Sequence, residues 1–112
     1  MKTFVFTLDL KDDPDLIAKY KQYHRAVWPE VIEGIKKNGL IHDRIYLLGN
    51  RLVMILETGD TFDPDRDLSR YTDEPRAKEW DKLMKTFQKA PPGAKPGELW
   101  SPMELVFDLD QY

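Results

Sequence analysis

Hydrophobic and polar residues alternate at the start of the chain and then change to a helical spacing. Within residues 3–10 one face of a predicted strand carries Phe4, Phe6, Leu8 and Leu10. A helix is expected to begin after Asp13, whose side chain can cap it, with Pro14 in its first turn. Pro29 removes a backbone donor from the apolar stripe that follows, so we expect a kink or a break just before it. Gly39 is expected to end the helical region.

The middle of the chain has the pattern of two paired strands. Two aliphatic and β-branched runs, 40–48 and 51–58, flank the turn-forming pair Gly49-Asn50, which predicts a β-hairpin. The next segment, 59–67, is rich in Asp, Pro and Thr and is predicted to be a loop.

The last third of the chain returns to a helix followed by a strand. A helix is predicted from Glu74-Pro75 onward by the spacing of Ala77, Trp80, Leu83, Met84 and Phe87. Residues 90–99 are expected to form an ordered loop or a lid. A closing strand is predicted for residues 103–110 by the alternation of Met103, Leu105, Phe107 and Leu109 with their neighbours.

The order strand, helix, strand, strand, helix, strand predicts an α+β fold of the ferredoxin-like βαββαβ type. Its antiparallel sheet would carry both helices on one face. A length of 112 residues and a mass of 13.2 kDa fit one domain that spans residues 1–112. The second sheet face also carries apolar residues, so a second subunit or a ligand should cover it, and a homodimer is expected.

Composition narrows the classes of partner. The chain has 17 Lys and Arg against 20 Asp and Glu, and a net charge of −3 argues against nucleic acid. No apolar run approaches the ~20 residues of a membrane span, and an acidic residue comes too early for a signal peptide. We therefore expect a cytoplasmic protein without membrane contact. The absence of Cys leaves catalysis to His, carboxylates, Tyr, Lys and Arg.

The first predicted helix carries the densest group of reactive side chains. Tyr20, His24 and Trp28 are spaced by four, which brings a phenol, an imidazole and an indole to one side. Such a stripe can bind a polyol, and His titrates nearest to neutral pH, which makes it the natural proton carrier. The alternative interpretation is that the two aromatic residues belong to the core and that His24 is a buried, hydrogen-bonded histidine.

Other reactive arrangements receive no support from the spacing. His42 is the second histidine, and Asp43 beside it belongs to the opposite face of a strand. No His-x-His or Glu-x-x-His spacing favours a metal site, so none is predicted. No glycine-rich nucleotide-binding loop or serine-hydrolase motif is present.

The helix pattern Tyr20, His24, Trp28-Pro29-Glu30 resembles the motif of the L-rhamnose mutarotase family, small enzymes that interconvert sugar anomers. The likeness covers nearly the whole chain and includes Gly39, Ile45-Tyr46-Leu47, Trp80, Met84, Glu104, Val106 and Phe107. The resemblance implies a dimeric ferredoxin-like fold of the α/β-barrel type. It also implies a monosaccharide substrate, no metal and no organic cofactor.

The resemblance also implies roles for individual residues. His24 corresponds to the proton donor of the family, and Tyr20 to a residue that contacts the sugar. Trp80 matches the first of two adjacent tryptophans, and Asp81 replaces the second. Asp43 stands where the family has a tyrosine. Two interpretations are open: a carboxylate that binds the substrate or acts as a base, and a surface carboxylate.

These observations predict an aldose mutarotase that acts on a deoxyhexose such as L-rhamnose. His24 would protonate the ring oxygen, with Tyr20 orienting it or a sugar hydroxyl and Trp80 stacking on the ring. Mutarotation of L-fucose or of another sugar stays open as an alternative. A ferredoxin-like dimer with a monooxygenase-type or purely sugar-binding role is the rival class, because topology alone does not decide function.

Overall fold

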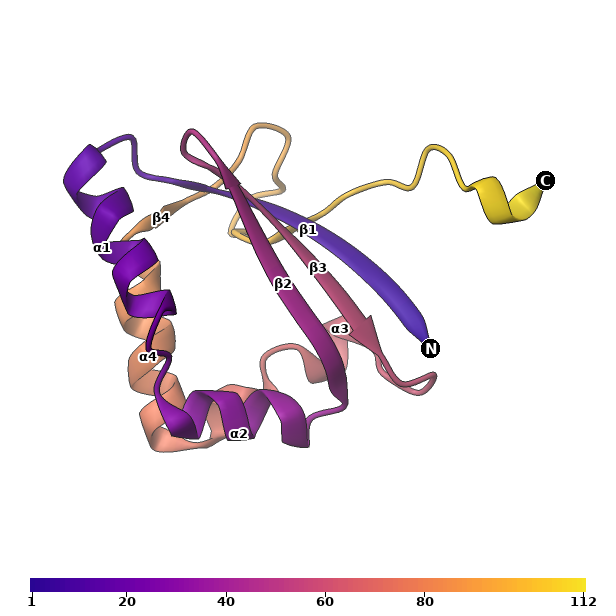
Figure 1. Cartoon of the computed structure of the whole chain (residues 1–112), viewed down its shortest axis with the longest axis horizontal. Coiled ribbons are helices and arrows are strands. Elements are labelled where there is room, and N and C mark those ends of the chain that lie inside the picture. The colour runs from indigo at the N-terminus through magenta and orange to yellow at the C-terminus, as the bar shows by residue number, and fades with distance from the viewer.

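The computed structural model describes residues 1–112 and shows strands and helices in the predicted order, with short elements added (Figure 1). The strands are β1 (Lys2–Leu10), β2 (Leu40–Leu48), β3 (Arg51–Thr58), β4 (Gln88–Lys89) and β5 (Ser101–Pro102). The α-helices are α1 (Pro14–His24), α2 (Pro29–Lys37), α3 (Pro64–Asp67) and α4 (Pro75–Lys85). Two 3₁₀ helices are η1 (Arg70–Asp73) and η2 (Leu109–Gln111).

The sheet is antiparallel and has the strand order β2-β3-β1-β4, with β5 also paired to β1. Helices α1, α2 and α4 all lie on one side of the strands (Figure 1). This arrangement confirms the predicted α+β fold of the ferredoxin-like type. None of the helices has the length and hydropathy needed to span a membrane. The cytoplasmic location stays a prediction.

The predicted helix break before Pro29 is confirmed, because α1 ends at His24 and α2 begins at Pro29. The Asp13 carboxylate caps α1 by accepting a hydrogen bond from the Asp15 amide at 2.9 Å. The break lets the chain turn between α1 and α2, as Figure 1 shows. It therefore leaves His24 at the last turn of α1.

The core lies between the helices and one face of the sheet. Residues Phe4, Phe6 and Leu8 of β1 stand opposite Leu56, Met54 and Leu52 of β3, so these six side chains share the inner face. Leu8 and Leu10 are completely buried, and the helices contribute Tyr20, Val31, Ala77, Trp80 and Met84 to the same cluster. The hydrophobic side chains of this layer hold the helices against the sheet.

The predicted closing strand over residues 103–110 is wrong. In the C-terminal region only Ser101 and Pro102 pair with β1, and one more hydrogen bond, from the Met103 amide to the Val5 carbonyl, continues the ladder. Pro102 has no N–H to donate, which weakens the pairing at that point. The following residues extend away from the domain (Figure 1), and Leu105, Val106, Phe107 and Leu109 are 65–90% exposed.

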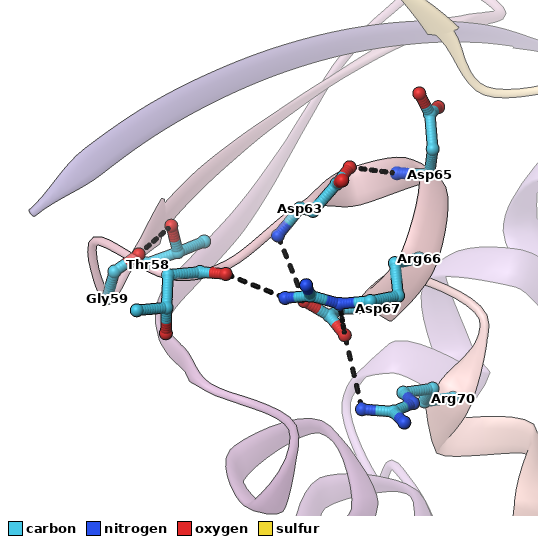
Figure 2. A network of polar contacts seen from close by, with 8 residues as sticks. Thr58, Gly59, Asp63, Asp65, Arg66, Asp67 and Arg70 are labelled. Atoms are coloured by element: carbon cyan, nitrogen blue, oxygen red, sulfur yellow. Dashed lines mark hydrogen bonds and ion pairs between the residues drawn. The ribbon is translucent and has the colours of Figure 1, made fainter.

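The loop predicted for 59–67 contains the short helix α3 and an ionic network around the buried Asp67 (Figure 2). The Asp67 carboxylate accepts hydrogen bonds from Arg66 at 2.9 and 2.7 Å, from the Asp63 amide at 2.9 Å and from Arg70 at 3.3 Å. These partners hold the pKa of Asp67 well below its usual range, Arg66 having the largest effect. The network fixes the segment that leads into η1 and α4.

Candidate active site

A cleft of about 1000 Å³ lies between the helices and the inner face of the sheet. Its polar side chains come mainly from α1, η1, α4 and β2 and include Tyr20, His24, Asp43, Tyr71, Asp81, Lys85 and Gln88. Its apolar side chains come mainly from α2, β2 and β3 and include Val31, Ile35, Ile45, Leu47 and Met54. The cleft therefore suits a ligand that is polar on one side and apolar on another.

His24 is half-buried at the end of α1, and one hydrogen bond sets its tautomer. Its Nδ1 lies 2.8 Å from the Tyr20 carbonyl oxygen, which can only accept, so Nδ1 carries a proton. In the neutral ring, Nε2 is then an unprotonated nitrogen that can accept a proton. Burial lowers the pKa of His24, and the hydrogen bond to Tyr20 partly opposes this shift.

Aromatic rings fix the imidazole from two sides. The Tyr20 ring lies 4.3 Å from the His24 ring between centroids, and the Trp80 ring lies 5.5 Å away in an edge-on arrangement. Trp28 in turn packs edge-on against Trp80 at 5.2 Å. Trp80 is only 4% exposed, so most of its surface supports other aromatic side chains, although it also lines the cleft.

Tyr20 and Gln88 lie on the same part of the cleft wall. Burial raises the pKa of Tyr20 to about 12, with the Gln88 side chain opposing the shift and Asp43 adding to it. The phenol therefore stays protonated near neutral pH and can donate a hydrogen bond.

Asp43 lines the cleft because the register of the β2–β3 hairpin places it on the inner face of the sheet. Asp43 pairs with Leu56 of the inner face, and the register shift of β2 lies beyond it, between Leu40 and His42. Asp43 has no ionic partner within 4 Å, and burial of its carboxyl raises the pKa to about 6. Asp43 therefore lines the cleft, while more than a third of its surface stays exposed, and its role in substrate binding stays a prediction.

The cleft also contains a group that the sequence patterns did not reveal. The Tyr71 hydroxyl donates to one Asp81 oxygen at 2.8 Å, and the Lys85 ammonium lies 2.8 Å from the other. Burial raises the pKa of Tyr71 far above its usual range, and Asp81 adds to the shift. The i,i+4 spacing of Asp81 and Lys85 was a signal of their pairing, but nothing in the sequence tied Tyr71 to them.

The four residues proposed from the sequence, Tyr20, His24, Asp43 and Trp80, thus all line one cleft. The fold and the cleft define a class: a small ferredoxin-like protein in which a histidine and carboxylates line an amphipathic cleft. Such a site suits proton transfer to a small polyhydroxylated molecule.

Comparison with known proteins identifies the class more closely. A family model described as L-rhamnose mutarotase matches residues 3–109. An L-fucose mutarotase of Xanthomonas campestris is 40% identical over 113 residues, which cover 99% of this chain and 90% of that protein. A UPF0734 protein of Dictyostelium discoideum is 44% identical over 115 residues, with coverages of 99% and 92%.

Two solved structures share the fold. The L-rhamnose mutarotase of Formosa agariphila has a TM-score of 0.69 at 21% identity and covers 97% of this chain and 99% of its own. The tetracenomycin F2 cyclase of Streptomyces glaucescens has a TM-score of 0.61 at 15% identity and covers 96% of each. At these identities the two structures support the architecture alone.

The chain belongs to the L-rhamnose mutarotase family. The sequence resemblance is confirmed, and so is the prediction of an isomerase that acts on sugars.

Proposed function

We propose that this protein interconverts the α and β anomers of a 6-deoxyhexose, with L-rhamnose as the first candidate substrate. The observation that carries the proposal is a half-buried His24 with Nε2 free, in an amphipathic cleft of a mutarotase-family chain. L-Fucose is the second candidate, because the Xanthomonas relative named for that sugar is 40% identical.

Anomer exchange needs two proton transfers. A base removes the proton of the anomeric hydroxyl while an acid protonates the ring oxygen, and the ring opens to an aldehyde that recloses on its other face. We assign the ring oxygen to His24 and the anomeric hydroxyl to Asp43. Each group reverses its role on closure, so the cycle returns both to their starting states. A positioned acid or base group typically increases the reaction rate by about 10²- to 10⁴-fold.

The environments of the two groups support this assignment. Burial raises the pKa of Asp43 to about 6 and lowers that of His24 below its usual 6.5. The two pKa values are therefore shifted toward each other, which favours the exchange of a proton through the sugar. Tyr20 then serves as a hydrogen-bond donor to the sugar, and Trp80 holds the imidazole and bounds the sugar site.

The apolar wall of the cleft supports a 6-deoxy sugar as the substrate. Ile45, Leu47 and Met54 offer contact to a methyl group in place of a hydroxymethyl group. Burying one such group is worth about 0.8 kcal/mol, whereas a hydroxyl there would lose its hydrogen bonds.

Exchange spectroscopy by NMR tests the function. Saturation transfer between the anomeric protons of L-rhamnose, L-fucose and other hexoses should increase on adding protein, and His24→Ala should remove most of the increase. Lys19→Ala, on the exposed side of α1, is the matched control. A binding domain would shift the resonances without faster exchange, and that result would exclude the mutarotase proposal.

We also propose that the protein is a homodimer. No helix covers the outer sheet face, where Tyr46 is 57% and Leu48 is 85% exposed, and the extended C-terminal residues expose Val106 and Phe107. A second copy can cover both surfaces, since large exposed apolar surfaces mark interfaces. Sedimentation should give twice the 13.2 kDa chain mass, and Tyr46→Arg with Val106→Asp should return it to one. A wild-type protein that sediments as a monomer at all concentrations would exclude the dimer.

A further inference from the structure

We propose that Asp81, held between Tyr71 and Lys85, selects the substrate by accepting hydrogen bonds from two adjacent hydroxyl groups of the sugar. This inference rests on the proposed function and adds a substrate feature, a vicinal diol away from the reacting carbon. Tyr71 and Lys85 are positioning residues for the Asp81 carboxylate.

Contacts between two elements hold the carboxylate at the cleft. Tyr71 comes from η1, while Asp81 and Lys85 are one turn apart on α4. The hydrogen bond from Tyr71 and the ion pair with Lys85 are 2.8 Å each and involve different carboxylate oxygens. The Asp81 side chain keeps 28% of its surface exposed, and all three residues line the cleft that contains His24.

The hydrogen-bonding capacity of this group is only partly used. A carboxylate has about four acceptor positions, and two are occupied by Tyr71 and Lys85. The Lys85 ammonium has three donors, and no hydrogen bond from it to another side chain is formed. Each carboxylate oxygen can thus accept a further hydrogen bond, which matches a pair of neighbouring hydroxyls, and Lys85 can donate to a hydroxyl oxygen.

Packing indicates that Tyr71 positions Asp81, rather than the reverse. A Cβ on Gly34 of α2 would lie 3.4 Å from both the Tyr71 Cβ and the Tyr71 carbonyl oxygen, so α2 packs closely against this residue. The Tyr71 hydroxyl stays protonated because burial raises its pKa. It is therefore a permanent donor fixed by α2, and it orients the carboxylate.

The two carboxylates of the cleft have different environments, which indicates different tasks. Asp81 has a cationic partner and a phenol donor, so its charge is compensated in place. Asp43 has neither, and it is the carboxyl whose pKa is raised to about 6. A compensated carboxylate suits permanent hydrogen bonding to hydroxyls, whereas an uncompensated one suits proton exchange.

The experiment compares Asp81→Asn with wild type on the best sugar and on analogues that each lack one hydroxyl. We measure Kd by resonance shift and kcat/KM by anomer exchange. Asp81→Asn should weaken binding of the full sugar by about 10- to 100-fold, as expected for hydrogen bonds to a charged group. An analogue that lacks a contacted hydroxyl should bind more weakly to wild type than the full sugar does. For that analogue, Asp81→Asn should reduce the affinity by less than it does for the full sugar. An equal loss for every sugar, or no loss, would overturn the proposal.

Two variants keep the result interpretable. Asp73→Asn makes the same chemical change at an exposed position of η1 and should leave all sugars unaffected. Tyr71→Phe removes one hydrogen bond and no charge, so it should reduce affinity by a smaller factor than Asp81→Asn, with the same dependence on the sugar hydroxyls. This variant provides the test if Asp81→Asn does not fold. Binding that depends on Asp81 without accelerated exchange would exclude the mutarotase function and leave the diol site supported.

Discussion

Asp43→Asn is expected to make the protein more stable and less active. The substitution preserves the size of the side chain and removes its charge. In the folded protein the pKa of Asp43 is raised from 3.8 to about 6, because burial disfavours the ionised form. The folded state thus holds this proton more tightly than the unfolded chain, and stability falls as the pH rises from 3.8 to about 6. Above that range the ionised carboxylate destabilises the fold.

The magnitude follows from the two pKa values. Their difference corresponds to about 3 kcal/mol at about 1.36 kcal/mol for each tenfold change. Asp43 lies on an edge strand and more than a third of its surface is exposed, so solvent screening reduces this to about 1 kcal/mol. For a domain of this size, Asp43→Asn should raise the melting temperature at pH 8 by about 4 °C.

Calorimetry at pH 8 and at pH 4 measures the effect. The gain in melting temperature should be present at pH 8 and should largely vanish at pH 4, while anomer exchange falls at least 100-fold, which is the low end of acid–base catalysis. Asp12→Asn, at an exposed position before α1, is the control for the substitution itself. A variant that is less stable than wild type at pH 8 would show that burial of the ionised carboxylate does not destabilise the fold, which would refute this prediction.

The catalysed rate of exchange should have a bell-shaped pH dependence, because the rate falls at low pH as Asp43, with a pKa of about 6, gains a proton, and falls toward alkaline pH as His24 loses its proton. A rate that climbs steadily from pH 6 to 8, after subtraction of the uncatalysed rate, would contradict the assignment of the two groups. Leu8→Ala should lower the free energy of unfolding in urea by about 2–5 kcal/mol, because Leu8 is 0% exposed, while the exposed Thr3→Ala changes little. Asp67→Asn should lower the melting temperature at pH 7, and the difference from wild type should narrow as the pH falls below 3.8, because the lowered pKa of Asp67 stabilises the fold only while the group is ionised.

Local interactions explain why much of the fold was predictable. The alternation in β1, the Gly49-Asn50 turn and the break before Pro29 each depend on residues close in sequence, and the structure confirms them. The contact between Tyr20 and His24 is also local, since residues four apart on a helix are neighbours. The sequence alone therefore determined the order of elements and the catalytic histidine candidate with its phenol neighbour.

The tertiary structure decided the rest, because those features depend on pairing between distant segments. Both faces of β2 are apolar in part, so the pattern left the direction of Asp43 open, and pairing with Leu56 of β3 placed Asp43 on the inner face. Tyr71 and Asp81 meet only because η1 packs against α4. The alternation after Pro102 predicted a strand. A strand needs a neighbouring strand to pair with and other residues to bury its apolar face, and the single chain provides neither beyond Met103.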